Sequence, residues 1–281
     1  MKVLVTGATG FVGNYVVWEL LKHNFNVIAS GVESSKEVHT SWLRKVDYVS
    51  ADLNKGRGDW FSFFGEPNIL IHLAWEGLPN YEELFHLERN LPKNHAFLKN
   101  MVEKGLRKVV VTGTCFEYGM QSGPLTEDLT AKPNNSYALA KDCLRKSLEQ
   151  LQKKIDYELT WIRVFYMYGK GQSQNSILSQ VDAALERGDK VFNMSGGEQL
   201  RDYLPVEKVA EYIVKISMQD KSSGIINCCS GEPISIRKLV EDYLAEINRS
   251  IELNLGFYPY PDYEPMAFWG NNNKLKKILS D

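Results

Sequence analysis

The sequence predicts an α/β fold, in which a doubly wound parallel sheet is followed by a smaller C-terminal lobe. Three observations predict it. Short, β-branched apolar segments alternate with amphipathic segments of helical length over the first 165 residues. The apolar segments are nearly continuous, as expected for parallel strands that are covered on both faces. From about residue 166 the pattern becomes irregular, with stretches rich in glycine, proline and aromatic residues, notably 169–176, 195–205 and 258–270.

The expected elements follow one another in the order that βαβ units require. The segment 2–6 (KVLVT) is short, β-branched and ended by a glycine, which is typical of a buried strand. The first helix carries apolar residues on one side: Val12, Val16, Val17, Leu20 and Leu21. We expect strands at 2–6, 26–30, 47–50, 68–73, 108–112 and 159–165, and helices at 11–23, 91–104 and 137–153.

Composition excludes several classes of protein. The chain has 281 residues and a net charge of −2, so no basic field indicates nucleic acid or anionic lipid as a partner. Its cysteines form no CxxC pair and its histidines show no metal-ligand spacing, so we expect no metal site. No apolar run approaches the roughly 20 residues of a membrane-spanning helix. We therefore expect a cytoplasmic protein without a nucleic-acid or membrane partner.

A glycine-rich turn, TGATGFVG at 6–13, lies between the first strand and the first helix. Gly7 permits the tight turn, Gly10 lets a pyrophosphate approach the backbone, and Gly13 lets the helix pack closely on the sheet. The start of the helix presents free N–H groups and the positive end of its dipole to the phosphates. A tight turn without a ligand is the alternative, but this position favours a dinucleotide site of the Rossmann type.

Five stretches spread over most of the chain carry a family resemblance: TGATGFVG at 6–13, HLAW at 72–75, VVTGTCFEYG at 110–119, YALAK at 137–141 and GGEQLRDYLPVEKVA at 196–210. Together they resemble the extended short-chain dehydrogenase/reductases, the NAD(P)-dependent sugar-nucleotide epimerase/dehydratase family. The resemblance implies an NAD(P)-binding Rossmann domain at 1–165, with return segments around 203–230. It also implies a lobe at 166–281 that mainly binds the substrate, a nucleotide-diphosphate sugar.

The same resemblance implies which residues hold NAD(P): Gly7, Thr9, Gly10, Phe11, Val12, Asp52, Leu53, Leu73, Ala74, Tyr137 and Lys141. NAD-preferring members end the second strand with an acidic residue that binds the ribose hydroxyls and repels a 2′-phosphate. That position is Gly31 here, and Glu33 lies two residues on. Residue types that bind phosphate lie around this position: Ser30, Ser34, Ser35 and Lys36. The sequence therefore favours NADP(H) over NAD(H).

Tyr137 and Lys141 are four residues apart, which places both on one face of a helix. A lysine ammonium beside a phenol is expected to lower the pKa of that phenol, so that it exchanges a proton with a substrate hydroxyl. Any surface helix can carry this pair, and the preceding glycine turn favours the catalytic interpretation. The resemblance places Thr114 at the family's catalytic Ser/Thr, whose hydroxyl hydrogen-bonds the reacting oxygen. The implied chemistry is hydride transfer between a nicotinamide and a sugar carbon.

The two residues that directly follow Thr114 limit which reaction of the family is expected. Family dehydratases carry Asp-Glu there, whereas this chain has Cys115 and Phe116, and a phenyl ring transfers no proton. We therefore expect a reductase of 4-keto-6-deoxy sugars linked to dTDP or CDP, which the tail YPYPDYEPMAFWGNNNKL also resembles. The alternatives are a 4-epimerase of nucleotide-diphosphate hexoses and a regulatory nucleotide-binding protein without turnover.

The expected substrate contacts are Trp75, Cys115, Phe116, Tyr166, Gln172 and Arg201. Arg201 matches a family arginine that meets the diphosphate, and a guanidinium suits phosphate. A salt bridge to Asp202 is the alternative. Tyr166 replaces the family's asparagine in RxFNxYG, so we expect this residue to stack on or hydrogen-bond the substrate in place of the usual diphosphate contact; filling space is the alternative.

A homodimer is also expected, because family members pair through the two helices placed here at 91–104 and 137–153. The apolar residues of these helices exceed what one face needs for the sheet: Phe97, Leu98, Met101, Leu144, Leu148 and Leu151.

Overall fold

A computed structural model describes residues 1–220, 224–260 and 262–280. The expected ranges 203–230 and 166–281, and the tail motif, include residues 221–223, 261 and 281, which lie outside the described residues.

The central sheet has seven strands in the order β11-β7-β5-β4-β1-β2-β3, and every neighbouring pair is parallel. The strands are β1 (Lys2–Thr6), β2 (Asn26–Gly31), β3 (Asp47–Ser50), β4 (Ile69–His72), β5 (Lys108–Thr114), β7 (Glu158–Val164) and β11 (Gly224–Cys228). The predicted doubly wound sheet is confirmed, with small shifts at strand ends. The order reverses between β1 and β4, and ligands of such sheets bind beyond the carboxyl ends of the strands at this point.

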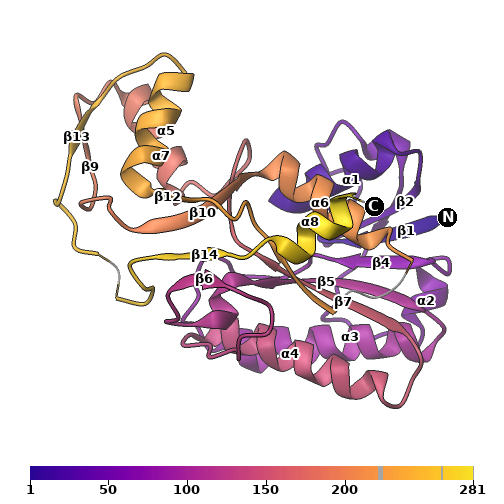
Figure 1. Cartoon of the computed structure of the whole chain (residues 1–281). Coiled ribbons are helices and arrows are strands. Elements are labelled where there is room, and N and C mark those ends of the chain that lie inside the picture. The colour runs from indigo at the N-terminus through magenta and orange to yellow at the C-terminus, as the bar shows by residue number, and fades with distance from the viewer. Residues whose placement is uncertain (221–223, 261, 281) are drawn as a thin grey trace.

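Helices cover both faces of the sheet (Figure 1). One face is covered by α1 (Phe11–Lys22), α6 (Val206–Ser217) and α8 (Asn273–Ser280). The other is covered by α2 (Trp60–Phe63), α3 (Leu91–Glu103) and α4 (Ser136–Gln152). Each face buries its own apolar core, because each strand turns alternate side chains to opposite faces. Among the described residues, the structure has no helix with the length and apolarity needed to cross a membrane.

The apolar residues from which we expected a dimer interface lie in the second of these cores. Five are almost completely buried within the chain and the sixth packs against them: Phe97, Leu98, Met101, Leu144, Leu148 and Leu151. The inference of a surplus is therefore wrong, because the contacts of the two helices with one another and with the face of the sheet that both cover use up this apolar surface. The homodimer itself stays a prediction.

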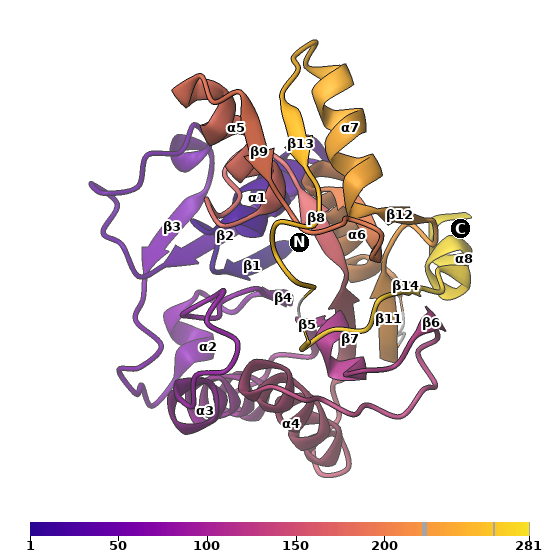
Figure 2. The same cartoon turned by 90° about the vertical axis from the view of Figure 1, so that its left-hand side faces the viewer.

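The C-terminal part adds α5 (Ile177–Arg187) and α7 (Ile236–Glu246), which lie near one another at one end of the molecule (Figure 2). Their apolar residues form a separate core. Small sheets accompany them: β12-β10-β8 from Pro233–Ser235, Leu200–Pro205 and Tyr166–Tyr168, β13-β9 from Glu252–Asn254 and Val191–Asn193, and β14-β6 from Phe268–Gly270 and Gly123–Leu125. The described residues also form short helical turns at η1 (Leu43–Lys45), η2 (His86–Asn90) and η3 (Cys115–Tyr118). The proposed division into two domains at residue 165 stays a prediction.

Candidate active site

The glycine turn forms a tight cradle between β1 and α1. Gly7 has a φ of +71°, and a Cβ built there would lie 2.8 Å from the backbone nitrogen of Ala74, just after β4. A Cβ at Gly13 would lie 2.1 Å from the Gly7 carbonyl oxygen. No side chain caps the start of α1, where Gly10 is the N-cap and Phe11 the first residue. A backbone this closely packed, with helix N–H groups at its mouth, fits the pyrophosphate of a dinucleotide.

A carboxylate lies over the end of β2, although Gly31 itself has no side chain. The Thr9 hydroxyl donates a hydrogen bond to Glu33 Oε2 at 2.9 Å. A Cβ built at Gly31 would lie 2.7 Å from that same oxygen, so Glu33 folds back over the glycine. The Tyr48 hydroxyl donates to the Glu33 carbonyl at 2.8 Å and fixes the turn. The acidic group that the sequence lacks at the strand end is thus supplied from two residues further on.

Ser34, one of the residues expected to bind phosphate, is hydrogen-bonded to the carboxylate of Glu37. The backbone N–H and hydroxyl of Ser34 both donate to Glu37 Oε2, at 2.8 and 2.7 Å. Asp52 is partly exposed and accepts two hydrogen bonds of 2.9 Å from Asn54, which hold its pKa low. The other predicted cofactor residues pack against the two cores of the sheet: Val12 and Leu73 on one face and Leu53 on the other.

The three predicted catalytic residues come together at the carboxyl end of β5. Thr114 is the last residue of that strand, and Asn135 caps α4 so that Tyr137 lies in its first turn. The Thr114 side chain lies close enough to the Tyr137 phenol to act on its pKa, which it lowers. The Lys141 ammonium, one turn further on, donates to the Thr112 carbonyl at 2.8 Å.

The protonation of Tyr137 differs from the expectation. Burial raises the pKa of its phenol, and the charges of Tyr81, Glu117 and Cys115 act in the same direction. The Lys141 ammonium lies 6.0 Å from the centre of the Tyr137 ring and is directed to Thr112 instead. The prediction that Lys141 lowers the pKa of this phenol is therefore wrong in this arrangement. A phenol that stays neutral at ordinary pH is suited to donate a proton.

Lys141 is itself strongly perturbed. Burial lowers its pKa to about 7. Its ammonium lies 4.1 Å from the centre of the Trp75 indole ring, which supports the charge through a cation–π contact. The indole N–H donates to His86 Nδ1 at 3.0 Å, and His86 Nε2 donates to the Asn80 carbonyl at 2.9 Å. Trp75, which we expected to contact substrate, thus contacts Lys141, and sequence reasoning missed the supporting histidine.

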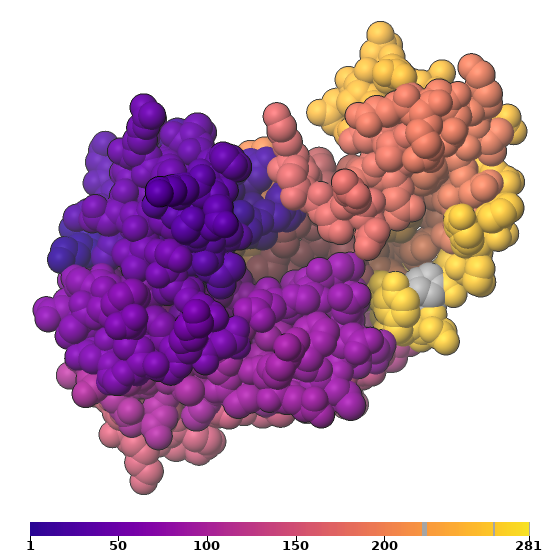
Figure 3. Space-filling model, turned by 180° about the vertical axis from the view of Figure 1, so that it is seen from behind, coloured from indigo at the N-terminus to yellow at the C-terminus, as the bar shows by residue number. Residues whose placement is uncertain are grey.

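A cavity of about 1190 Å³ opens beside this group, between the N-terminal part and the C-terminal segments. Figure 3 shows the molecule hollowed between the indigo and orange parts of the chain. Four of the six expected substrate residues line the cavity: Phe116, Tyr166, Gln172 and Arg201. The Gln172 amide is turned to the Met167 carbonyl at 2.7 Å. Cys115 lies behind the wall, and burial raises the pKa of its thiol, which keeps it protonated and unsuited to proton transfer at neutral pH.

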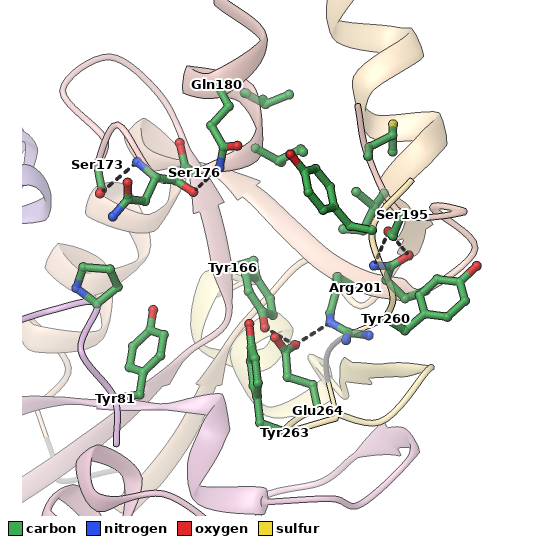
Figure 4. Close-up of a pocket in the computed structure, with 18 of the residues that line it drawn as sticks. Tyr81, Tyr166, Ser173, Ser176, Gln180, Ser195, Arg201, Tyr260, Tyr263 and Glu264 are labelled. Carbon is green, nitrogen blue, oxygen red and sulfur yellow. Dashed lines mark hydrogen bonds and ion pairs between the residues drawn. The ribbon is translucent and has the colours of Figure 1, made fainter. Parts of the chain in front are cut away.

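Glu264 is a cavity residue that sequence reasoning missed. It accepts hydrogen bonds from the Tyr166 hydroxyl and, at 2.8 Å, from Arg201 Nε (Figure 4). Arg201 therefore pairs with Glu264. The alternative pairing with Asp202 is wrong, because that carboxylate accepts hydrogen bonds from Ser230 and neighbouring N–H groups. An acidic residue in a proline-rich tail, 63 positions from Arg201, gives no local sign of this contact.

Comparison with known proteins agrees with this geometry. The model of the NAD dependent epimerase/dehydratase family matches residues 3–229. The chain is 32% identical over 279 residues to dTDP-6-deoxy-L-talose 4-dehydrogenase (NAD(+)) of Aggregatibacter actinomycetemcomitans, a match that covers 96% of this chain and 99% of that one. It is 24% identical to dTDP-4-dehydro-6-deoxyglucose reductase of Escherichia coli, covering 88% of this chain and 82% of that one.

Solved structures agree on the fold. UDP-glucuronic acid 4-epimerase from Bacillus cereus, in complex with UDP-glucuronic acid and NAD, superposes with a TM-score of 0.84 at 21% identity, covering 100% of this chain and 93% of that one. The family match spans most of the sheet, the glycine cradle and the residues grouped around Tyr137. The chain belongs to the NAD-dependent epimerase/dehydratase family.

Proposed function

We propose that this protein is an NAD(P)-dependent oxidoreductase that acts at C4 of a nucleotide-diphosphate sugar and reduces a 4-keto-6-deoxy sugar linked to dTDP or CDP. The observation that carries the proposal is the meeting of Thr114, Tyr137 and Lys141 at the carboxyl end of β5, where burial keeps the Tyr137 phenol neutral and the Lys141 ammonium is held by the Thr112 carbonyl. Two relatives support it, because their names assign them to dTDP-linked 6-deoxy sugars.

The chain's own residues divide the work of ketone reduction. The Thr114 and Tyr137 hydroxyls hold the C4 oxygen, and Tyr137 gives it the proton that converts the oxyanion into a hydroxyl. Lys141, charged below a pKa of about 7, faces the developing negative charge from one turn away. A dinucleotide whose pyrophosphate is held by the glycine cradle would supply, from its reduced nicotinamide, the hydride that C4 receives. Phe116 lines the cavity beside Tyr81 and offers no group for dehydration.

The proposed cofactor is NAD(H), which replaces the preference for NADP(H) expected from the sequence. The carboxylate of Glu33 lies over Gly31, where it accepts hydrogen bonds from ribose hydroxyls and repels a 2′-phosphate. Ser34 is engaged with Glu37 and does not need a phosphate partner.

NADH is therefore expected to bind at least tenfold more tightly than NADPH in a calorimetric titration of the purified protein. Glu33→Ser removes the charge, so the ratio of the two Kd values is expected to narrow by about tenfold, since one charge–phosphate repulsion is worth roughly 1–2 kcal/mol. Glu103→Gln, which removes an exposed carboxylate of α3 that pairs with Lys99, is the matched control and leaves the ratio unchanged. Equal or tighter binding of NADPH by the unmodified protein would contradict the assignment.

The test of the activity is NADH consumption by the purified protein with dTDP-, CDP-, GDP- and UDP-linked 4-keto-6-deoxy sugars. The proposal expects stoichiometric oxidation of NADH with a dTDP- or CDP-linked substrate. The 4-epimerase alternative expects interconversion of 4-hydroxy sugars without net NADH consumption. The regulatory alternative expects dinucleotide binding without turnover of any of these compounds.

A further inference from the structure

A fully buried carboxylate lies directly behind the reacting group. Glu117 is three residues after Thr114, in η3, and no part of it reaches solvent. Its Oε1 accepts the backbone N–H of Thr114 at 3.0 Å and the indole N–H of Trp161 at 2.9 Å. Its Oε2 accepts Arg163 Nε at 2.8 Å. A charge removed from water is retained only where it is paired and hydrogen-bonded in this way, so the position of this side chain is fixed.

The strand leaves room for this carboxylate at Gly113. A Cβ built there would lie 2.3 Å from Glu117 Oε1 and 2.1 Å from Trp161 Nε1. Any side chain at this position would therefore displace the two groups that hold the end of β5. Position 113 therefore requires a glycine, because the Glu117 carboxylate and the Trp161 indole fill the space where a side chain would lie.

The contacts of Glu117 set the direction in which Thr114 points. Thr114 and Glu117 form a reciprocal capping box, in which the Thr114 side chain accepts the Phe116 N–H at 3.3 Å while Glu117 receives the Thr114 N–H. With both its backbone and its hydroxyl held, Thr114 has little freedom to rotate away from Tyr137.

The same carboxylate faces the helix that carries the other two residues. Arg145 lies two turns after Tyr137 on α4, so the two share one face with Lys141. Arg145 Nε lies 4.0 Å from Glu117 Oε2, while its other nitrogens pair with Asp142 and Glu149. Glu117 thus joins the end of β5, the strand β7 and the helix α4 at one point.

We propose that Glu117 is a positioning residue of the catalytic group: it fixes Thr114 opposite Tyr137, and its negative charge stabilises the Lys141 ammonium. The inference rests on the proposed function. Glu117 touches neither substrate nor cofactor in this assignment and acts through Thr114 and Lys141.

The charge argument depends on what surrounds Lys141. Burial lowers the pKa of His72, at the end of β4, to about 3 and also lowers that of His86 in η2, so both rings are neutral at ordinary pH. Tyr137 is neutral for the reason given above, and Arg145 on the same helix is positive and pairs with carboxylates. Within the described part of the chain, Glu117 is the group that raises the pKa of Lys141 against burial.

The test compares Glu117→Gln with Glu149→Gln, which removes a half-exposed carboxylate from the same arginine and leaves Thr114 untouched. Glu117→Gln is expected to retain NADH affinity and the KM for the 4-keto sugar within about twofold. Its kcat is expected to fall about tenfold to a hundredfold, because Thr114 is less well held. The alkaline limb of its rate profile is expected to move to lower pH by about half a unit or more, because the charge that favours the ammonium is gone. Glu149→Gln behaves as the unmodified protein.

A second readout does not depend on turnover. In protein labelled with ¹³C at lysine Cε, the Lys141 resonance is assigned by its absence from Lys141→Met and titrated with pH. A lower pKa in Glu117→Gln supports the electrostatic half of the proposal even if no substrate is turned over, an outcome that would count against the proposed function alone. Unchanged kcat and an unchanged titration in Glu117→Gln would overturn the inference while leaving the function intact.

A second variant tests the proposal if Glu117→Gln does not fold. If Glu117→Gln fails to fold, because Arg163 is left unpaired, the double variant Glu117→Gln/Arg163→Gln replaces the ion pair by two amides and undergoes the same measurements. Failure of both variants to fold would overturn the proposal, since it would assign Glu117 to folding and not to catalysis.

Discussion

Tyr137→Phe is expected to lower turnover of an accepted 4-keto sugar nucleotide by about 10²–10⁴-fold, the range that a positioned proton donor contributes. The phenyl ring remains, so its contacts with Tyr81, His86 and Trp75 remain as well. The buried position tolerates Tyr137→Phe, because a phenyl ring has no hydroxyl that needs a hydrogen-bond partner. The fold, the thermal midpoint and NADH affinity are therefore expected to be preserved, and steady-state kinetics measure the loss.

Thr114→Val is the companion change. It removes one hydrogen bond to the reacting oxygen and keeps the shape of the side chain, so a smaller loss of about tenfold to a few hundredfold is expected. Activity of Tyr137→Phe within threefold of the unmodified protein would reject the catalytic assignment of this residue. The dinucleotide cradle at Gly7 would be unaffected by that result.

Lys141→Met is expected to abolish turnover and at the same time to stabilise the fold. Burial depresses the pKa of Lys141 from 10.5 to about 7. At about 1.4 kcal/mol per unit, the buried ammonium therefore lowers the free energy of unfolding by a few kcal/mol. Methionine keeps the length of the side chain without the charge. The thermal midpoint is expected to rise by several degrees, at about 2–4 °C for each kcal/mol in a chain of this size.

The pH dependence of that gain identifies its cause. Below pH 7 Lys141 is protonated in both the folded and the unfolded chain, and its destabilising effect is present in full. Between about 7 and 10.5 the unfolded chain binds the proton and the folded one does not, so the stability of the unmodified protein rises with pH. The difference between the two midpoints is therefore expected to be largest below pH 7 and to shrink toward pH 10. A variant that is less stable at every pH would contradict the account of Lys141.

The fold and the glycine cradle followed from local chemistry in the sequence. Gly7, Gly10 and Gly13 stand at fixed spacing between a strand and a helix, and only close backbone packing requires that pattern. The spacing of Tyr137 and Lys141 placed both on one helix face, and the parallel sheet brought Thr114 to the same edge.

The rest of the site depends on contacts between distant segments. Glu33 reaches the end of β2 only because the turn after the strand folds back over Gly31. The residue type at position 31 gives no sign of this turn. Glu264 meets Arg201 from 63 positions away. The direction of the Lys141 ammonium is set by Trp75 and by a backbone carbonyl, so the expected effect on the Tyr137 phenol did not follow from helical spacing.

The measurement that tests the central claim most directly is transfer of deuterium from NADH labelled at C4 of the reduced nicotinamide to the sugar. With NADH dideuterated at C4 of the nicotinamide and a dTDP- or CDP-linked 4-keto-6-deoxy sugar, the account predicts one deuterium at C4 of the product for each NADH oxidised. It predicts no deuterium bonded to C4 in the product formed with unlabelled NADH in D₂O. A 4-hydroxy product without deuterium at C4, or interconversion of C4 epimers without oxidation of NADH, would contradict it.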